Sequence, residues 1–304
     1  MPEGPEVRKY ADALDESLSG RVIQSVQART RNAREWLLQN GERLSGHPVA
    51  QVVSHGKHLI GYIKGGFYFH SHLMMWGRWT VVFSAPSVVD RRERARIVVS
   101  GAAAILFSAP IFDVGEGDPY QQIDFLSSLG PDVLPYDGAF NEREFRQRLL
   151  SPQHLGLSIG AALLNQQILA GVGNYLRAEI LFVCNINPWR KVGQLSRFEL
   201  NCLSREAPKL ARRAYLHGAT ASEEDRARME HKPALVYQSG REYGTRHLVF
   251  RRTNLACLRC GEIIRQLRQG TWDALEEERS RIIYFCPNCQ NVKLPDQNGR
   301  SLQA

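Results

Sequence analysis

The middle of the chain contains the stretch LAGVGNYLRAEIL, residues 169–181. Gly171 and Gly173 suit a tight turn, because glycine adopts backbone conformations that other residues avoid. The apolar spacing that follows predicts a helix over residues 174–183. The first N–H groups of such a helix can hold a phosphate, and the Asn174 side chain adds a donor. The same pattern also suits a simple link between two helices, so both interpretations stay open for the stretch by itself.

Helical patterns continue on both sides of this turn. The expected helices cover residues 141–150 with Asn141 as the N-cap, residues 159–169, and a segment opened by the capping-box pair Ser196 and Glu199. We expect residues 218–247 to connect these helices to the C-terminal end. Cys184 and Cys202 lie among apolar residues, which favours two buried thiols.

The residues before 135 have a different pattern. Val7, Leu14 and Leu18 follow helical spacing, and Gly20 suits the end of that helix. Short β-rich segments separated by turns then follow, at residues 22–26, 49–53, 58–63, 67–70, 79–83, 96–99 and 104–107. This order predicts a β-sandwich preceded by a helix.

Four of the six cysteines form two Cys-x2-Cys pairs, at Cys257 and Cys260 and at Cys286 and Cys289. Paired thiolates on two tight turns supply four ligands for one tetrahedral zinc ion, and four cysteines leave no open position for catalysis. A disulfide framework would need an oxidising compartment, for which the sequence has no targeting signal. The spacing therefore predicts one structural Zn²⁺.

The composition favours a polyanionic partner. Formal net charge is +8, and the hydrophobic fraction of 43% can support more than one core across 304 residues. No apolar run reaches membrane-spanning length, and the acidic start is unlike a signal peptide. We therefore expect an intracellular protein with no membrane partner.

The chain opens with Met1-Pro2-Glu3. Once Met1 is removed, Pro2 presents a secondary α-amine, which is partly uncharged near neutral pH. Such an amine can attack a sugar's anomeric carbon and form an iminium, which is chemistry for breaking a glycosidic bond. Pro2 also suits methionine removal and the start of a helix. Both interpretations remain possible for Pro2 alone.

Four further motifs accompany the central stretch in order: PEGPE (2–6), SHGK (54–57), LGPDVL (129–134) and RIIYFCPNCQ (281–290). Together they resemble the formamidopyrimidine-DNA glycosylase/endonuclease VIII family of base-excision repair enzymes, from Pro2 to about Gln290. The resemblance implies an α+β multidomain fold with an N-terminal β-sandwich, a helix–two-turn–helix domain and a zinc-finger β-hairpin. We expect their boundaries at 1–135, 136–252 and 253–291, with a tail at 292–304.

The resemblance also implies a bifunctional DNA glycosylase and abasic-site lyase. Pro2 would form the Schiff base and Glu3 would protonate the sugar ring oxygen. Glu6 would support that acid, although the helix dipole also favours an acidic residue at a helix N-terminus that has no catalytic role. Lys57 and Arg281 would contact phosphate and assist β- and δ-elimination; a solvated turn lysine and a strand-edge arginine are the structural alternatives.

The partner implied by the resemblance is damaged, double-stranded DNA bound by a monomer. Gly173 and Asn174 would hold phosphate. Met74, Met75 and Trp76 stand where the family places residues that fill the gap left by an extruded nucleotide, although such a cluster also suits a core. His55 and His58 flank Lys57 and are expected to have no chemical role.

Several details favour the endonuclease VIII branch and oxidised pyrimidines. Residues 108–113, SAPIFD, lack the Asp-x-Arg-x-Phe-Gly pattern of the formamidopyrimidine branch. The alternatives are an oxidised-purine glycosylase and a non-catalytic zinc-dependent DNA-binding protein. The acidic run at 276–278 predicts that the tip of the zinc hairpin does not lie flat on phosphate.

Overall fold

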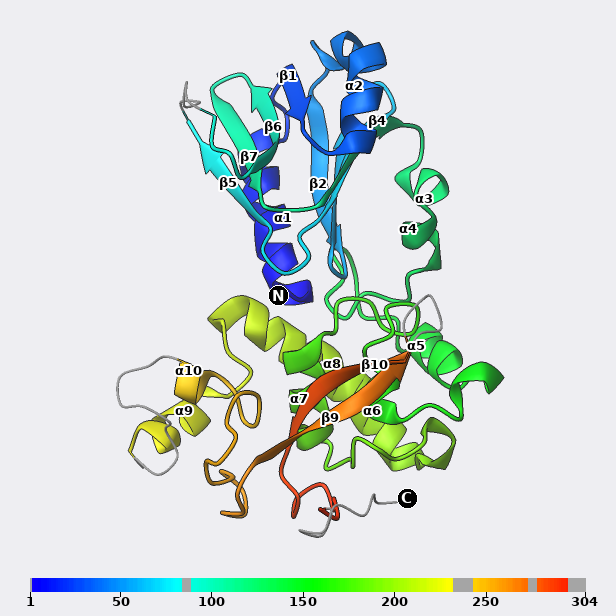
Figure 1. Cartoon of the computed structure of the whole chain (residues 1–304), viewed down its shortest axis with the longest axis vertical. Helices are drawn as coiled ribbons and strands as arrows, with labels where there is room; N and C mark the ends of the chain where they lie inside the picture. Colours follow the sequence, from blue (N-terminus) through cyan, green and yellow to red (C-terminus); the bar gives the residue numbers. More distant parts are fainter. Residues whose placement is uncertain (1, 84–88, 232–242, 273–277, 295–304) are drawn as a thin grey trace. The chain divides into compact units, whose positions relative to one another are not determined.

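The structure is a computed structural model that describes residues 2–83, 89–231, 243–272 and 278–294. The chain divides into two compact units, residues 1–139 and residues 140–304. Both units are visible in Figure 1, and each is described by itself.

Unit 1 contains two four-stranded antiparallel sheets, with strand orders β1-β6-β7-β5 and β2-β3-β4-β8. The strands are β1 (Ile23–Ala28), β2 (Val49–His55), β3 (His58–Ile63), β4 (Phe67–His72), β5 (Arg78–Val82), β6 (Glu93–Val99), β7 (Ala102–Phe107) and β8 (Ile111–Glu116). The predicted β-sandwich is confirmed. The strand β8 was not predicted.

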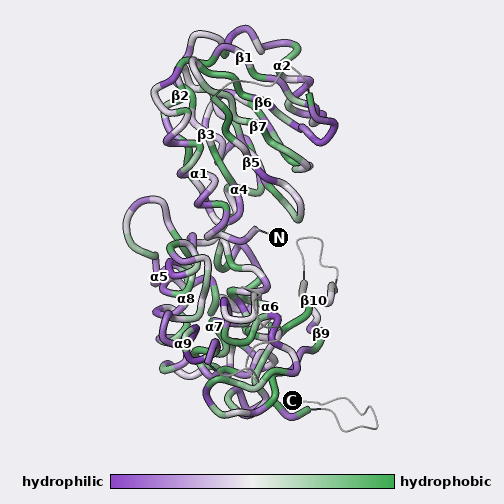
Figure 2. The backbone as a smooth tube through the Cα atoms, turned by 90° about the vertical axis from the view of Figure 1, so that its left-hand side faces the viewer, coloured by the Kyte–Doolittle hydropathy of each residue, from purple (hydrophilic) through white to green (hydrophobic). Residues whose placement is uncertain are grey.

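Aromatic rings join the two sheets. Trp79 of β5 lies 6.2 Å from Phe69 of β4 and 6.0 Å from Phe112 of β8, measured between ring centroids. All three side chains are buried. Strand β7 is coloured as hydrophobic in Figure 2, and its residues 102–106 are all buried.

Two helices close the two sides of the sandwich. Helix α1 (Gly4–Leu18) contacts the edge strands β2 and β5, whereas α2 (Arg31–Leu44) contacts the edge strands β1 and β8. Val7, Leu14 and Leu18 of α1 are buried, and each such side chain contributes about 1.5–3 kcal/mol to stability. The helix at residues 7–18 was predicted and α2 was not. Short helices α3 (Pro119–Gln122) and α4 (Asp124–Ser128) follow the last strand.

The described residues of unit 2 form helices and one two-stranded sheet. Its helices are α5 (Glu142–Leu149), α6 (Ile159–Ala162), α7 (Asn174–Val183), α8 (Arg197–His217), α9 (Glu223–Glu230) and α10 (Tyr243–Arg246). The predicted N-cap Asn141 accepts a hydrogen bond from the N–H of Glu144, and Ser196 and Glu199 form the predicted capping box. Helices α9 and α10 lie where only a connection was expected.

The helix predicted over residues 159–169 is wrong beyond Ala162. Its continuation is interrupted at Asn165, whose side-chain oxygen accepts a hydrogen bond from the N–H of Gln167 at 2.9 Å. Asparagine side chains offer the backbone a local partner in this way, and they thereby compete with helical hydrogen bonds. The chain folds into turns up to residue 173 instead.

Cys184 and Cys202 form a disulfide in the structure, with their Cα atoms 5.7 Å apart. Two separate buried thiols were expected, so this expectation is wrong. The pair joins the C-cap of α7 to α8. The amphipathic spacing of each segment did not reveal that these two residues face each other.

Strands β9 (Arg265–Trp272) and β10 (Glu278–Phe285) form an antiparallel hairpin next to α7. The tip of the hairpin, including residues 276 and 277 of the acidic run, lies outside the described residues, as do Met1 and residues 295–304. Within the part of the chain that the structure describes, no helix is both long and apolar enough to span a membrane.

Candidate active site and metal centre

The first candidate residues lie at the N-terminus of α1. Glu3 is the N-cap of this helix and is only 2% exposed. The Glu6 carboxylate accepts a hydrogen bond from the backbone N–H of Glu3 at 2.9 Å, which is the return half of a capping box. Pro2, directly before Glu3, is half-buried. The start of the chain is therefore held by the helix that follows it.

Lys57 lies on the tight turn between β2 and β3, and it is 8% exposed. Gly56 has the left-handed backbone conformation that this turn requires, with φ of +58°. The buried Asp132 carboxylate accepts hydrogen bonds from the N–H groups of Gly56 and Leu134, each at 2.9 Å. Burial raises the pKa of Asp132, although both hydrogen bonds act in the opposite direction.

His55 makes a second connection between the same two motifs. Its Nε2 lies 2.9 Å from the carbonyl oxygen of Gly130, and its Nδ1 lies 2.9 Å from the hydroxyl of Tyr120. The SHGK and LGPDVL segments, distant in sequence, thus meet at the turn that carries Lys57. Lys57 is 8% exposed, whereas a solvated lysine on a turn would be largely exposed.

Met74, Met75 and Trp76 project from the turn between β4 and β5, with exposed fractions of 43%, 60% and 78%. The N–H of Gly77 donates to the carbonyl of Leu73 at 2.8 Å and closes the turn at its base. A Cβ atom at Gly77 would lie 2.5 Å from that carbonyl oxygen, so no larger residue fits there. These three side chains therefore do not belong to the core.

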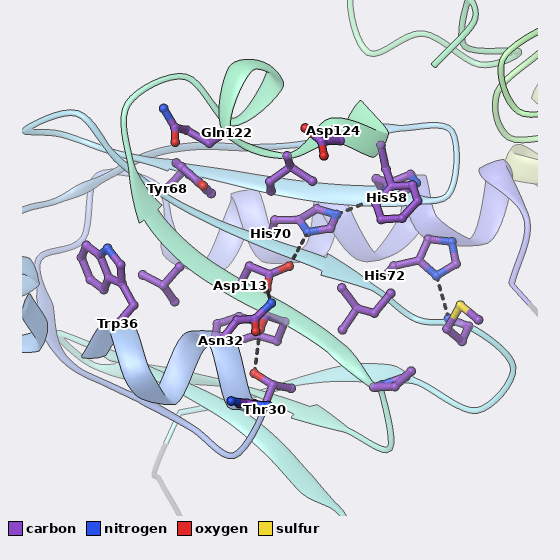
Figure 3. Close-up of a pocket in the computed structure, with 18 residues that line it drawn as sticks. Thr30, Asn32, Trp36, His58, Tyr68, His70, His72, Asp113, Gln122 and Asp124 are labelled. Atoms are coloured by element: carbon purple, nitrogen blue, oxygen red, sulfur yellow. Dashed lines mark hydrogen bonds and ion pairs between the residues drawn. The ribbon is translucent and has the colours of Figure 1, made fainter. Parts of the chain in front are cut away.

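Three histidines line a hollow of about 840 Å³ beside this turn (Figure 3). His58 and His72 are cross-strand partners on β3 and β4, and His70 is paired with Asp113 of β8. His58 Nδ1 lies 2.9 Å from His70 Nε2, and His70 Nδ1 lies 3.2 Å from the Asp113 carboxylate. Sequence reasoning assigned no role to these groups. The alternation His70-x-His72 was a signal for a shared face, but the strand predicted over residues 67–70 ended before His72, whereas β4 includes it.

In unit 2, Gly173 is the N-cap of α7 and Asn174 is its first residue. The preceding turn is held by Gln166, which accepts a hydrogen bond from the N–H of Gly171 and donates one to the carbonyl of Val172. The Arg177 guanidinium donates to the Asn174 amide oxygen at 2.9 Å. This contact orients the NH₂ end of Asn174 away from Arg177.

Arg177 also connects α7 to the hairpin. Its guanidinium donates to the carbonyl of Ile282 at 2.8 Å, and the arginine side chain is fully buried. Arg281, the residue before Ile282, is exposed and is paired in register with Gln269 of β9. Asn174 and the strand that carries Arg281 are thus held by one guanidinium.

The four predicted cysteine ligands form one cluster, in which every Sγ atom lies within 4.8 Å of the others. Cys257 Sγ is 3.8 Å from Cys289 Sγ, and Cys260 Sγ is 3.4 Å from Cys286 Sγ. Four sulfurs at 2.3 Å from a tetrahedral zinc would be about 3.8 Å apart, so the cluster fits such an ion. Burial raises the pKa of the Cys286 thiol to about 12, and a divalent cation would favour its thiolate form.

Comparison with known proteins agrees with this architecture. Residues 1–110 match the model of the formamidopyrimidine-DNA glycosylase N-terminal domain, and residues 129–225 match that of the H2TH domain of the same enzymes. The protein named endonuclease 8 from Salmonella schwarzengrund (strain CVM19633) is 31% identical over 291 residues, which cover 95% of this chain and all of the relative. Endonuclease 8 from Klebsiella pneumoniae is 30% identical and covers 96% of this chain and all of its own length.

Solved structures share the fold. Formamidopyrimidine-DNA glycosylase from Lactococcus lactis, non-covalently bound to DNA containing an AP site, superposes with a TM-score of 0.73 at 22% identity over 95% of this chain and 99% of that chain. The same enzyme bound to DNA containing N7-benzyl-Fapy-dG gives a TM-score of 0.70 with the same coverage and identity.

A β-sandwich led by a capped helix, a helical H2TH unit and a four-cysteine hairpin define a DNA glycosylase of base-excision repair. The chain belongs to the formamidopyrimidine-DNA glycosylase/endonuclease VIII family, whose members are glycosylases with abasic-site lyase activity.

Proposed function

We propose that this enzyme removes oxidised bases, preferably pyrimidines, through a Schiff base on Pro2 and then cleaves the strand. The observation that supports this most is the first turn of α1, where the buried Glu3 follows Pro2 and is held by Glu6. The reaction needs a nucleophile and a proton donor at the same sugar. Two adjacent residues whose positions are fixed can supply both.

In this reaction the Pro2 nitrogen, freed of Met1, forms a bond to C1′ while the bond from C1′ to the damaged base breaks. The electron pair leaves with the base, which takes up the proton that the Pro2 nitrogen loses. Glu3 donates its proton to the ring oxygen as the sugar opens, which leaves a cationic iminium between Pro2 and C1′. Loss of a C2′ proton then expels the 3′ phosphate by β-elimination, and a second elimination expels the 5′ phosphate.

Phosphate recognition is assigned to groups in both units. Lys57 and Arg281 would supply positive charge near the phosphates and assist the two eliminations. Gly173 and Asn174, at the N-terminus of α7, would hold a phosphate without reading sequence. The orientation of the Asn174 amide by Arg177 supports this assignment, because it directs the donating end of Asn174 away from the Arg177 guanidinium.

Double-stranded DNA containing the damaged base is the proposed partner, and the protein would act as a monomer. Met74, Met75 and Trp76 would enter the base stack and occupy the space of the extruded nucleotide. Their exposure on a closed turn supports this role, since such side chains contribute nothing to the core of unit 1.

The preference for oxidised pyrimidines has two supports. The relatives from Salmonella and Klebsiella at 30–31% identity are named endonuclease 8. Residues 108–113 lack the loop pattern of the formamidopyrimidine branch, and Ile111–Asp113 belong instead to strand β8. An oxidised-purine glycosylase is the alternative.

The metal at the four cysteines is proposed to be one structural Zn²⁺, which would supply no chemistry to the reaction. Bound by Cys257, Cys260, Cys286 and Cys289, it would fix the base of the β9–β10 hairpin and hence the strand that carries Arg281. We propose the functional divisions 1–135, 136–252, 253–291 and 292–304.

Borohydride trapping tests the mechanism. Protein processed at Met1 is mixed with duplexes that carry an abasic site, thymine glycol or 8-oxoguanine, and Pro2→Gly is the control. A covalent adduct that depends on Pro2 is expected, with thymine glycol trapped faster than 8-oxoguanine. Faster trapping on 8-oxoguanine would select the purine alternative. Absence of any adduct would leave a DNA-binding protein without lyase chemistry.

A further inference from the structure

The turn that exposes Met74, Met75 and Trp76 contains a backbone conformation that needs support. Met74 has φ of +51°, in the left-handed region that residues with a Cβ atom rarely adopt. The turn is closed at its base by the hydrogen bond from the Gly77 N–H to the Leu73 carbonyl at 2.8 Å. Something in the surrounding structure must therefore favour this conformation at Met74.

The imidazole of His72 provides that support. Its Nδ1 accepts a hydrogen bond from the backbone N–H of Met74 at 3.1 Å. A backbone N–H can only donate, so Nδ1 of His72 carries no proton and the ring's proton lies on Nε2. The contact fixes the orientation of the peptide plane between Leu73 and Met74, and the carbonyl of that same peptide accepts the hydrogen bond from the Gly77 N–H that closes the turn.

The ring of His72 is itself fixed by the other histidines of the hollow. It packs edge-on against His58, with ring centroids 4.7 Å apart, and His58 is stacked on His70 at 5.2 Å. The Asp113 carboxylate accepts from Nδ1 of His70, which leaves His70 Nε2 as the acceptor for His58 Nδ1–H. Figure 3 shows His58, His70 and Asp113 connected in this order, with His72 beside them.

We propose that His72 is a positioning residue that holds the Met74–Trp76 turn in its exposed conformation, and that His58, His70 and Asp113 fix the ring of His72 for this purpose. The inference rests on the proposed role of Met74, Met75 and Trp76 in filling the base stack. It assigns a function to a cluster that the reaction itself does not use.

The charged surroundings favour the neutral ring that this contact requires. Burial, followed by the charge of Lys57 from the β2–β3 turn, lowers the pKa of His72 to about 4. Burial and then His72 lower the pKa of His58 well below its ordinary value. Asp113 of β8 and Asp124 of α4 are the acidic groups that line the hollow. Nδ1 of His72 therefore remains an acceptor throughout the neutral range.

The test compares His72→Asn with His72→Leu. The Asn side-chain oxygen can replace Nδ1 as an acceptor, whereas Leu cannot accept, and both variants lack the Nε2 donor. The readout is the rate of cleavage at an abasic site in a duplex divided by the rate on the same single strand, which has no base stack to open. His47→Leu, in the same unit, is the matched control.

We expect His72→Leu to lower this ratio about five- to tenfold, the effect of losing about one hydrogen bond, and His72→Asn to stay within about twofold of the parent. Equal ratios for the Asn and Leu variants would overturn the inference. If His72→Leu does not fold, His72→Gln replaces it, because its longer side chain places the acceptor elsewhere.

A double-mutant cycle with Met74→Gly gives an independent answer. Glycine adopts the left-handed conformation without strain, so the turn should no longer need His72. The effect of His72→Leu should therefore shrink in the Met74→Gly background, and an unchanged effect would contradict the proposal. Met75→Ala distinguishes failure of the His72 proposal from failure of the proposed role of Met74, Met75 and Trp76. An unchanged ratio of duplex to single-strand cleavage in Met75→Ala would refute the role of these three residues in filling the base stack.

Discussion

Helices α1 and α7 both begin at candidate functional residues, but the charges in their first turns differ. Glu3 and Glu6 lie at the start of α1, and the Glu6 carboxylate is used to hold the chain end. The first turn of α7 contains no acidic residue, and Arg177 lies one turn from its start. A helix N-terminus carries a partial positive charge. Glu6 caps that end of α1 with its carboxylate, whereas the first turn of α7 has no acidic residue that would repel the phosphate we propose for it.

The residues in the first turn therefore decide whether a helix N-terminus holds part of its own chain or is available for the proposed phosphate contact. Carboxylates at the start of α1 hold the chain end on which the proposed nucleophile lies, and their absence from the first turn of α7 is compatible with the phosphate contact proposed there.

The largest effect is expected from metal removal, which acts only on the α7 side. A structural zinc site contributes on the order of 10 kcal/mol to the folding of small zinc domains. Chelation should therefore open the β9–β10 hairpin, measured as faster amide hydrogen exchange in residues 265–272 and 278–285. Amides of α1 should keep their protection. Unaltered exchange in the hairpin after verified metal loss would exclude a structural metal.

Glu3→Gln tests the α1 side. Removing the proposed acid should lower the single-turnover rate of base excision about 10²- to 10⁴-fold, while affinity for lesion DNA persists because the phosphate-binding groups are untouched. Gel-shift and excision assays on one duplex measure both quantities. Excision at the parent rate would remove Glu3 from the mechanism.

Asn174→Ala tests whether the start of α7 binds phosphate. Loss of one phosphate contact should weaken binding of every DNA sequence by a similar factor and lower the slope of log K against log salt by about 1. Asn141→Ala is the matched control, since this Asn is the N-cap of α5. A salt slope equal to that of the parent would leave Asn174 with a structural role only.

The smallest effect is expected at Glu6. Glu6→Ala removes the acceptor for the N–H of Glu3 and should cost about 0.5–2 kcal/mol of stability, as for other lost caps. Glu6→Gln keeps an acceptor oxygen and should recover most of this loss in thermal melts. If Glu6→Gln is as stable as the parent yet excises slowly, Glu6 acts on the proton of Glu3 as well as on the helix.

Local sequence signals predicted those elements whose stability is local. The bounds of α7 and β3 agree with the residues 174–183 and 58–63 expected from spacing alone. The four cysteines were predicted as one cluster, and the structure confirms it. The cysteines are closely spaced on two turns, so the positions of their side chains depend little on the rest of the fold.

Elements that depend on distant partners were missed. Strand β8 contains Asp113 and Gly115, which are typical of loops, and it is a strand because it pairs with β4. Helix α2 fully buries only the small Ala33 and the terminal Leu44, while Trp36 and Leu37 are partly buried against the core, so its inner face is recognised only once β1 and β8 are in place. The contacts among the histidines depend on the same pairings of β3, β4 and β8, which local periodicity does not reveal.

The placement of α1 and α2 has a consequence for solubility. Unpaired strand edges are templates on which other chains can add strands and aggregate. The sandwich has four such edges, and α1 lies against β2 and β5 while α2 lies against β1 and β8. Helix α2 thus shields two strand edges from self-association in addition to packing on the core, and its loss should show first as aggregation during expression.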